Sequence, residues 1–77
     1  MNIIYFGKIA AIANATSEEV SLPENTITAL VTYLTEKYQL DMSDMQIAVN
    51  HNLVDVQKEI LLKETDEVAI LSAFAGG

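Results

Sequence analysis

The sequence predicts an α+β fold in which one main helix and a short N-terminal helix lie against a mixed β-sheet. Three observations lead to this prediction. Several short segments alternate apolar and polar residues, as strands do. Residues 26–38 carry apolar side chains three and four positions apart, as a helix packed on a sheet does. The last apolar segment is nearly uninterrupted, which is typical of a central strand.

Residues 1–6 predict the first strand. Ile3 and Tyr5 share one face of this strand, whereas Phe6 lies on the opposite face. The Ala- and Ile-rich segment 8–14 that follows predicts the short helix.

Residues 17–22 alternate again and predict a second strand, ended by Pro23, that pairs with the first strand as a hairpin. Residues 26–38 predict the main helix, and Asn25 or Thr26 can cap its start. Because threonine and valine are poor helix formers, this helix needs packing against a sheet to be stable.

The second half of the chain predicts further extended segments. Residues 45–49 predict a strand, 50–52 suit a tight turn because Asn tolerates left-handed backbone, and 53–54 resume an extended chain. Residues 59–62 predict a short edge piece, and 68–73 predict the last strand. If the first and last strands lie side by side in the middle of the sheet, this order of elements makes a β-grasp.

The length of 77 residues predicts a single domain over 1–77, with a flexible C-terminal tail at about 73–77. A domain this small has little room for a catalytic pocket beside its core. We therefore expect a carrier, a subunit, an inhibitor or an interaction module rather than a self-sufficient enzyme. The carboxylates, Glu18 and Glu19 among them, fall in predicted turns or at strand edges, so we expect them to be solvated.

The charge balance is strongly acidic. Four lysines and no arginine stand against eleven carboxylates, which gives a net charge of −7. Nucleic acids and anionic membrane surfaces attract clustered basic residues, so neither is an expected partner. A protein partner with a basic face fits this charge, and plain solubility explains it equally well.

The sequence contains no cysteine, and His51 is its single histidine. Disulfides, thiolate metal sites and histidine clusters are therefore excluded, and we expect no bound metal. We expect a cytoplasmic protein, because secreted domains of this size usually carry disulfides. No apolar run approaches the length of a membrane span.

The end of the chain, Ala75-Gly76-Gly77, is its most distinctive feature. Two glycines carry no side chains and leave the terminal carboxylate open, so this end can thread a narrow channel. Five extended residues reach at most about 17 Å. Because a carboxylate must be activated before it reacts, for example as an acyl-adenylate, the chemistry would be done to this chain by partners. The alternative is an inert tail.

Several motifs resemble the family of molybdopterin synthase small subunits. They are A-V-N-H-N-L-V at 48–54, T-D-E-V-A at 65–69 and the terminal G-G. The opening I-I-Y-F-G-K at 3–8, followed by a short helix, is also similar to that family. The resemblance extends over essentially the whole chain and implies a ubiquitin-like β-grasp sulfur carrier.

The resemblance implies that Gly77 is adenylated by a ubiquitin-activating-like enzyme, which uses ATP, and is then converted to a thiocarboxylate. The tail, with Gly76 and Ala75 as its slender approach, would enter the large subunit of molybdopterin synthase and donate sulfur to cyclic pyranopterin monophosphate. Two carriers would flank a dimer of large subunits. The chain itself would bind no cofactor and have no activity alone.

Members of this family dock through an apolar patch on the sheet. The matching positions are Phe6, Leu53 and Leu71, with Phe74 in the tail. Strand alternation independently places Phe6 opposite Ile3 and Tyr5, and it places Leu71 opposite Val68 and Ile70. The alternative is that Leu71 is buried, as both faces of a central strand often are.

Other carriers remain open. Thiamine-pathway sulfur carriers and other ubiquitin-like carriers or modifiers share the fold and the terminal chemistry, but thiamine carriers tend to lack the helix at 8–14. An acyl carrier protein matches in size and acidity, yet it is all-helical and needs an Asp directly before its serine, which Ser43 lacks. A non-catalytic interaction module is the most distant alternative.

Overall fold

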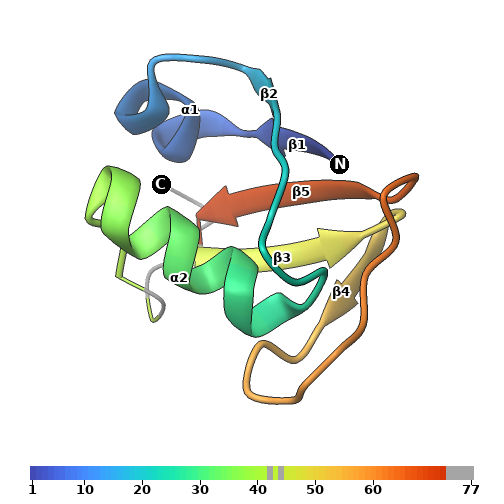
Figure 1. Ribbon diagram of the computed structural model, residues 1–77. Coiled ribbons are helices and arrows are strands. Elements are labelled where there is room, and N and C mark those ends of the chain that lie inside the picture. Colours follow the sequence, from blue (N-terminus) through green and yellow to red (C-terminus); the bar gives the residue numbers. More distant parts are fainter. Residues whose placement is uncertain (42, 44, 73–77) are drawn as a thin grey trace.

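The computed structural model describes residues 1–41, 43 and 45–72, whose arrangement is shown in Figure 1. The helices and strands follow one another along the chain in the predicted order. In chain order they are β1 (Asn2–Tyr5), α1 (Gly7–Ala13), β2 (Ser17–Glu19), α2 (Ile27–Tyr38), β3 (Met45–Val49), β4 (Asn52–Val54) and β5 (Glu67–Ser72).

The strands of this described part form one mixed sheet in the order β2-β1-β5-β3-β4. β1 and β5 pair in parallel, and every other neighbouring pair is antiparallel. The first and last strands therefore lie side by side inside the sheet, which confirms the predicted β-grasp arrangement. α2 runs across one face of this sheet (Figure 1).

The hydrophobic core lies between α2 and the sheet. Alternate residues of the strands and the apolar stripe of α2 meet there with no exposed surface. Burial of this kind contributes roughly 1.5–3 kcal/mol for each large aliphatic side chain. The side chains that are fully buried are Ile3, Ile27, Leu30, Leu34, Ile47, Val68 and Ile70.

The short helix α1 interrupts the β1–β2 hairpin without breaking it. Gly7, with φ of 51°, turns the chain out of β1 into the helix, a backbone angle that suits glycine. Asn14, with φ of 56°, ends the helix in the left-handed region that Asn tolerates. The Tyr5 amide then donates to the carbonyl of Thr16 at 2.9 Å, so the two strands still pair around the inserted helix.

Thr26 caps the main helix α2. Its Oγ1 accepts a hydrogen bond of 3.1 Å from the amide of Ala29, which satisfies one of the free donors of the first turn. Of the two predicted caps, Thr26 is the one used. At the other end Gln39 takes a left-handed φ of 52° and stops the helix.

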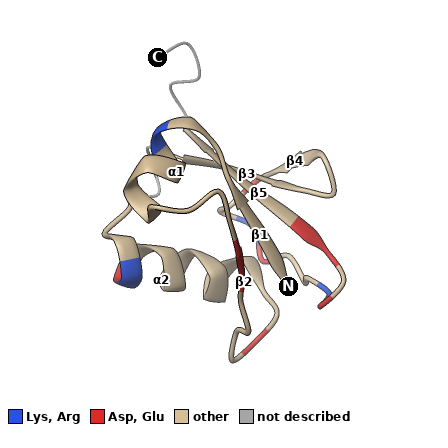
Figure 2. Cartoon of the chain, turned by 90° about the horizontal axis from the view of Figure 1, so that it is seen from above, with Lys and Arg blue, Asp and Glu red and all other residues tan. Residues whose placement is uncertain are grey.

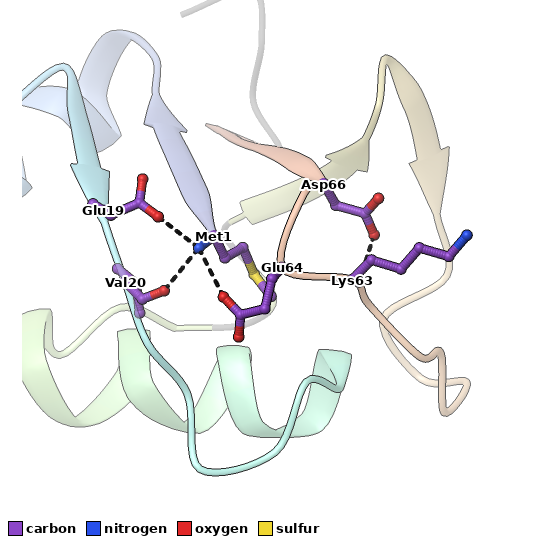
Figure 3. Close-up of polar contacts among 6 residues, drawn as sticks. All are labelled: Met1, Glu19, Val20, Lys63, Glu64 and Asp66. Atoms are coloured by element: carbon purple, nitrogen blue, oxygen red, sulfur yellow. Dashed lines mark hydrogen bonds and ion pairs between the residues drawn. The ribbon is translucent and has the colours of Figure 1, made fainter.

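The chain's start is held by polar contacts between separate segments (Figure 3). The Met1 ammonium group donates to Glu19 Oε1 at 2.7 Å, to the Val20 carbonyl at 3.1 Å and to Glu64 Oε2 at 3.3 Å. The hydrogen bond to Glu19 raises the pKa of this ammonium group above its ordinary value. These contacts join the residue before β1 to the end of β2, to the residue that follows β2 and to the turn before β5.

The expectation that Glu18 is solvated is wrong. Its carboxylate accepts hydrogen bonds of 2.7–2.8 Å from four donors, and its side chain is only 23% exposed. Partial burial acts to raise its pKa, but the hydrogen bonds together hold the pKa down at about 2. The donors, which come from β1 and α2, are Tyr5, Tyr33, Lys37 and Tyr38.

Two predicted boundaries also change. The second strand ends at Glu19 rather than at residue 22, because only residues 17–19 face β1 in register. Residues 59–62 make no regular strand; Leu61 forms a single bridge with Thr26. Within the described ranges, neither helix is long and apolar enough to cross a membrane.

Candidate functional site

The face of the sheet opposite α2 carries a shallow apolar hollow of about 370 Å³. Phe6, Leu53 and Leu71 all line it, so the structure brings these three predicted docking residues together. Phe6 is 48% exposed and Leu53 is 66% exposed. The docking role assigned to the three stays a prediction, and Phe74, Ala75, Gly76 and Gly77 lie outside the described residues.

Strand alternation produces this hollow. In β5, Val68 and Ile70 point into the core, whereas Ala69 and Leu71 point to the open face. Leu71 is half-buried rather than sealed in the core. The alternative that both faces of this central strand are fully covered therefore does not hold for the described part of the chain.

Two alanines form the floor of the hollow. Ala48 of β3 lies opposite Ala69 of β5, and Leu53 of β4 lies opposite Ala48 on its other side. Leu53 therefore lies at one edge of this floor of alanine methyl groups. Leu71 lies two residues beyond Ala69 in β5, where it pairs with Gln46 of β3. Both alanines fall within the motifs that carry the family resemblance, but sequence reasoning did not name them as site residues, although the alternation around Ile47 and Ile70 marks them.

The hollow has a polar rim. Gln46, His51 and Glu67 line its edge, and among the described lining residues Glu67 is the one that is charged. Sequence reasoning missed Gln46 and Glu67 as site residues, and it considered His51 only as a turn residue. Only their positions could have indicated this role, because Gln46 and Glu67 are strand residues whose side chains alternate toward the open face and His51 lies in the adjoining turn.

Asn50 fixes this rim in place. Its Nδ2 donates to Asp66 Oδ1 at 2.9 Å, and its Oδ1 accepts from the amide of Glu67 at 3.0 Å. The Asn50 amide donates to the Glu67 carbonyl at 2.8 Å, so the β3–β4 turn is tied to the start of β5. The hydrogen bonds from Asn50 and from the Lys63 amide, the latter drawn in Figure 3, lower the pKa of Asp66.

The strands that build the hollow carry almost no charge. β1, β3 and β4 contain no charged residue, and β5 contains only Glu67, so the acidic and basic positions lie around the sheet's central strands (Figure 2). An exposed apolar area of this kind, rimmed by polar groups, is typical of a protein–protein contact surface.

The described residues around this hollow favour recognition over metal binding. Within 1–41, 43 and 45–72, no three histidine, cysteine or acidic side chains lie where they could share a metal ion. The lining side chains are aliphatic, aromatic or amide groups, apart from His51 and Glu67. The arrangement is suited to recognising a partner.

Comparison with known proteins gives consistent results. The profile of the ThiS family matches residues 3–77. A molybdopterin synthase sulfur carrier subunit from Drosophila melanogaster is 32% identical over 81 residues, covering 100% of this chain and 90% of that protein. The corresponding protein from Drosophila yakuba is also 32% identical with the same coverage.

Solved structures share the fold. A putative molybdopterin converting factor, subunit 1, from Pyrococcus furiosus has a TM-score of 0.71 at 23% identity, with 92% of this chain and 93% of that chain covered. Small archaeal modifier protein 1 from Methanosarcina acetivorans has a TM-score of 0.72 at 21% identity, with 99% and 94% covered. Given the fold and the match of the family profile to nearly the whole length, this chain belongs to the ThiS family.

Proposed function

We propose that this protein is the sulfur carrier subunit of a molybdopterin synthase and that Gly77 carries the sulfur. The observation that carries the proposal is the apolar hollow on the open face, whose central strand β5 leads directly into the Gly-Gly end of the chain. A partner that covers Phe6, Leu53 and Leu71 is therefore within reach of the tail. The names of the relatives at 32% identity support the same function.

The chemistry falls on the terminal carboxylate. In a first partner, an adenylating enzyme of the ubiquitin-activating type, the Gly77 carboxylate attacks ATP and displaces pyrophosphate. A sulfur donor at the oxidation level of sulfide then attacks the acyl carbon and displaces AMP, which forms the C–S bond of a thiocarboxylate. The carrier binds neither ATP nor a metal itself, and ATP is the substrate of the activating partner.

In the second partner, the large subunit of the synthase, the thiocarboxylate sulfur bonds to cyclic pyranopterin monophosphate. Water then cleaves the Gly77 C–S bond, which leaves the sulfur on the pterin and restores the Gly77 carboxylate. Ala75 and Gly76 give the tail the slender form needed to enter that active site, and Phe74 contacts the partner at its entrance. The carrier is inactive alone, and most catalytic residues belong to the large subunit. Two carriers on a dimer of large subunits give a heterotetramer in the cytoplasm.

The reach of the tail supports this division of labour. The described strand ends at Ser72, and five further residues extend at most about 17 Å. The hollow can therefore remain against one surface of the partner while the carboxylate reacts in an interior site. The net charge of −7 favours partners with a basic face and disfavours nucleic acid.

The test is a reconstituted synthase assay with chemically thiocarboxylated protein. Adding one residue after Gly77 moves the reactive carbonyl by about 3.5 Å, and a misplacement of even 1 Å can lower the rate about 100-fold. We expect the extended chain, a chain lacking Gly77 and the variant Gly76→Phe all to lose sulfur transfer while keeping the circular dichroism spectrum of the parent. Transfer by the extended chain at the parent rate contradicts the proposal.

The same assay separates a second candidate. The ThiS profile leaves open a carrier that serves another sulfur acceptor, such as the thiamine pathway. In that case the adenylating enzyme still forms the thiocarboxylate, which mass spectrometry of the intact chain detects as oxygen replaced by sulfur. The large synthase subunit and its pterin substrate then give no product with the unaltered chain.

A further inference from the structure

Glu67, at the start of β5, carries a carboxylate that has no partner within the described part of the chain. Its side chain lines the rim of the apolar hollow and is half-buried there. The ion pairs among the described residues involve Glu18, Glu19 and Glu64, and the hydrogen bonds of Glu67 come from its backbone. The Glu67 carboxylate is therefore free to pair with a group from another molecule.

The backbone of Glu67 is held in place although its side chain is unpaired. Its amide donates to Asn50 Oδ1 at 3.0 Å, and its carbonyl accepts from the Asn50 amide at 2.8 Å. On its other side Glu67 is in register with Asn2 of β1. The carboxylate therefore extends from a fixed point of the sheet, and only the rotations of its own side chain must be ordered when it binds.

The hollow has one charged end and one apolar end. Glu67, Ala69 and Leu71 are alternate residues of β5 on the open face, so Glu67 and Leu71 are about 13 Å apart along the strand. The Phe6 amide donates to the Ile70 carbonyl at 3.1 Å, which places Phe6 beside Leu71 at the apolar end. A surface that fits the hollow must therefore differ between its two ends.

A partner that covers the whole hollow also removes water from Glu67. An exposed ion pair contributes little, but a carboxylate that loses water without gaining a partner is strongly unfavourable. A purely apolar surface is therefore rejected at this end of the hollow. A basic side chain at the matching position instead gives the carboxylate a charge-assisted hydrogen bond.

We propose that Glu67 is a specificity-determining residue, which pairs with an arginine of the partner about 13 Å from the partner's apolar contact with Leu71. Arginine fits this place because its planar group pairs with both carboxylate oxygens and is weakly hydrated. The inference rests on the proposed function, since it takes the large synthase subunit as the partner. The net charge of −7 attracts any basic surface, whereas Glu67 selects one with its charge at this position.

The test compares two variants that change the net charge equally. Glu67→Gln removes the charge and keeps the size of the side chain, and the control is Glu24→Gln, since Glu24 is exposed and does not line the hollow. We expect Glu67→Gln to weaken binding of the large subunit about 10-fold or more, mainly through faster dissociation, and the control to change it less than about 2-fold. Surface plasmon resonance measures both rates, and circular dichroism checks the fold.

Sulfur transfer adds a second readout. With thiocarboxylated protein, Glu67→Gln should raise KM by a similar factor and leave kcat unchanged, because it alters binding and not the tail. The binding experiment needs no thiocarboxylate, so a parent chain that binds but transfers no sulfur contradicts the proposed function alone. Equal binding of Glu67→Gln and Glu24→Gln, with sulfur transfer by the parent intact, overturns the role of Glu67 alone.

A double-mutant cycle identifies the partner's arginine. Each surface arginine of the large subunit is changed to alanine and tested against the parent chain and Glu67→Gln. In one of these variants, Glu67→Gln should weaken binding no further, because the pair is already broken. Retention of the full effect of Glu67→Gln in every arginine variant overturns the proposal.

Discussion

The two faces of the sheet use the same strands for different purposes, and β5 shows the contrast most clearly. On the face covered by α2, Val68 and Ile70 have no exposed surface. On the open face, Ala69 and Leu71 line a hollow that stays accessible. Because successive side chains of a strand point to opposite faces, alternate residues of β5 contribute to the core or to the hollow. A substitution should therefore mainly change stability at one position and mainly change binding at the next.

The polar contacts differ between the two faces as well. Beside the covered face, Glu18 gathers donors from β1 and α2 and ties the edge strand β2 to the main helix. Beside the open face, Asn50 ties one turn to the start of β5. The first cluster joins layers of the fold, whereas the second shapes the rim of the hollow.

The largest effect on stability is expected on the covered face. Ile70→Ala should lower the free energy of unfolding by about 2–5 kcal/mol, because it removes a fully buried side chain and leaves a cavity. Urea denaturation monitored by circular dichroism measures this loss. Leu71→Ala is the matched neighbour and should cost clearly less. Equal losses would show that the two faces do not differ in their contribution to stability.

A change on the open face should act on binding instead. Leu71→Asp places a charge in the hollow and should weaken binding of the large synthase subunit by about 2 kcal/mol or more, roughly 30-fold. Isothermal titration calorimetry checks the affinity, and a thermal melt checks the fold. The control is Leu61→Asp, since Leu61 is 80% exposed and does not line the hollow. Severe unfolding of Leu71→Asp, or equal weakening by the control, contradicts the prediction.

The Glu18 cluster should give the covered side a characteristic pH dependence. The folded pKa of Glu18, at about 2, lies below its ordinary value of 4.5. The contribution of the Glu18 carboxylate to the free energy of unfolding is therefore complete above pH 4.5 and is lost as the pH falls toward 2.

Glu18→Gln removes the charge while keeping the shape of the side chain. We expect this variant to be less stable than the parent by about 1–3 kcal/mol at neutral pH, since hydrogen bonds to a charged group contribute that much. The difference should shrink as the pH falls from 4.5 toward 2, which urea titrations at several pH values can follow. A difference that stays constant over that range would mean that the charge of Glu18 does not matter. Glu24→Gln is a suitable control, because Glu24 is exposed and outside the cluster.

The smallest effect is expected at the rim of the hollow. Asn50 and His51 both have left-handed backbone, with φ of 50° and 72°, so glycine suits either position. Asn50→Gly loses two side-chain hydrogen bonds and should cost about 1 kcal/mol more than His51→Gly. Paired urea denaturation curves can resolve this difference. A larger loss for His51→Gly would show that the Asn50 side chain does not hold the rim.

Much of the fold could be predicted because local patterns and tertiary structure agree. The stripe of α2, the alternation of β3 and the uninterrupted β5 each point to the element that forms. Residues 20–22 continue the alternation of β2 but pass beyond the end of β1, where no partner strand is available. Residues 59–62 form no strand for a similar reason, since Leu61 lies beside Thr26, the cap of α2, rather than beside a strand.

The site could be predicted only in part. Parity placed Phe6 and Leu71 on the open face, and the family resemblance added Leu53. The Glu18 cluster could not be predicted, because its donors are 13 to 20 positions away in the sequence and meet only when α2 packs on the sheet. The alanine floor was missed because small residues give a weak signal until their register partners are known.

The parallel pairing of β1 with β5 has a consequence for how the chain is made. The central strand β5 is the last one to be synthesised. β1 can therefore pair early with β2, but it obtains its parallel partner only when nearly the whole chain has been made. A chain cut before Glu67 would leave two separate hairpins with nothing between them. Cooperative folding of the whole sheet therefore requires synthesis to have passed Ser72, so a partner that recognises the folded sheet seldom meets a chain that lacks β5.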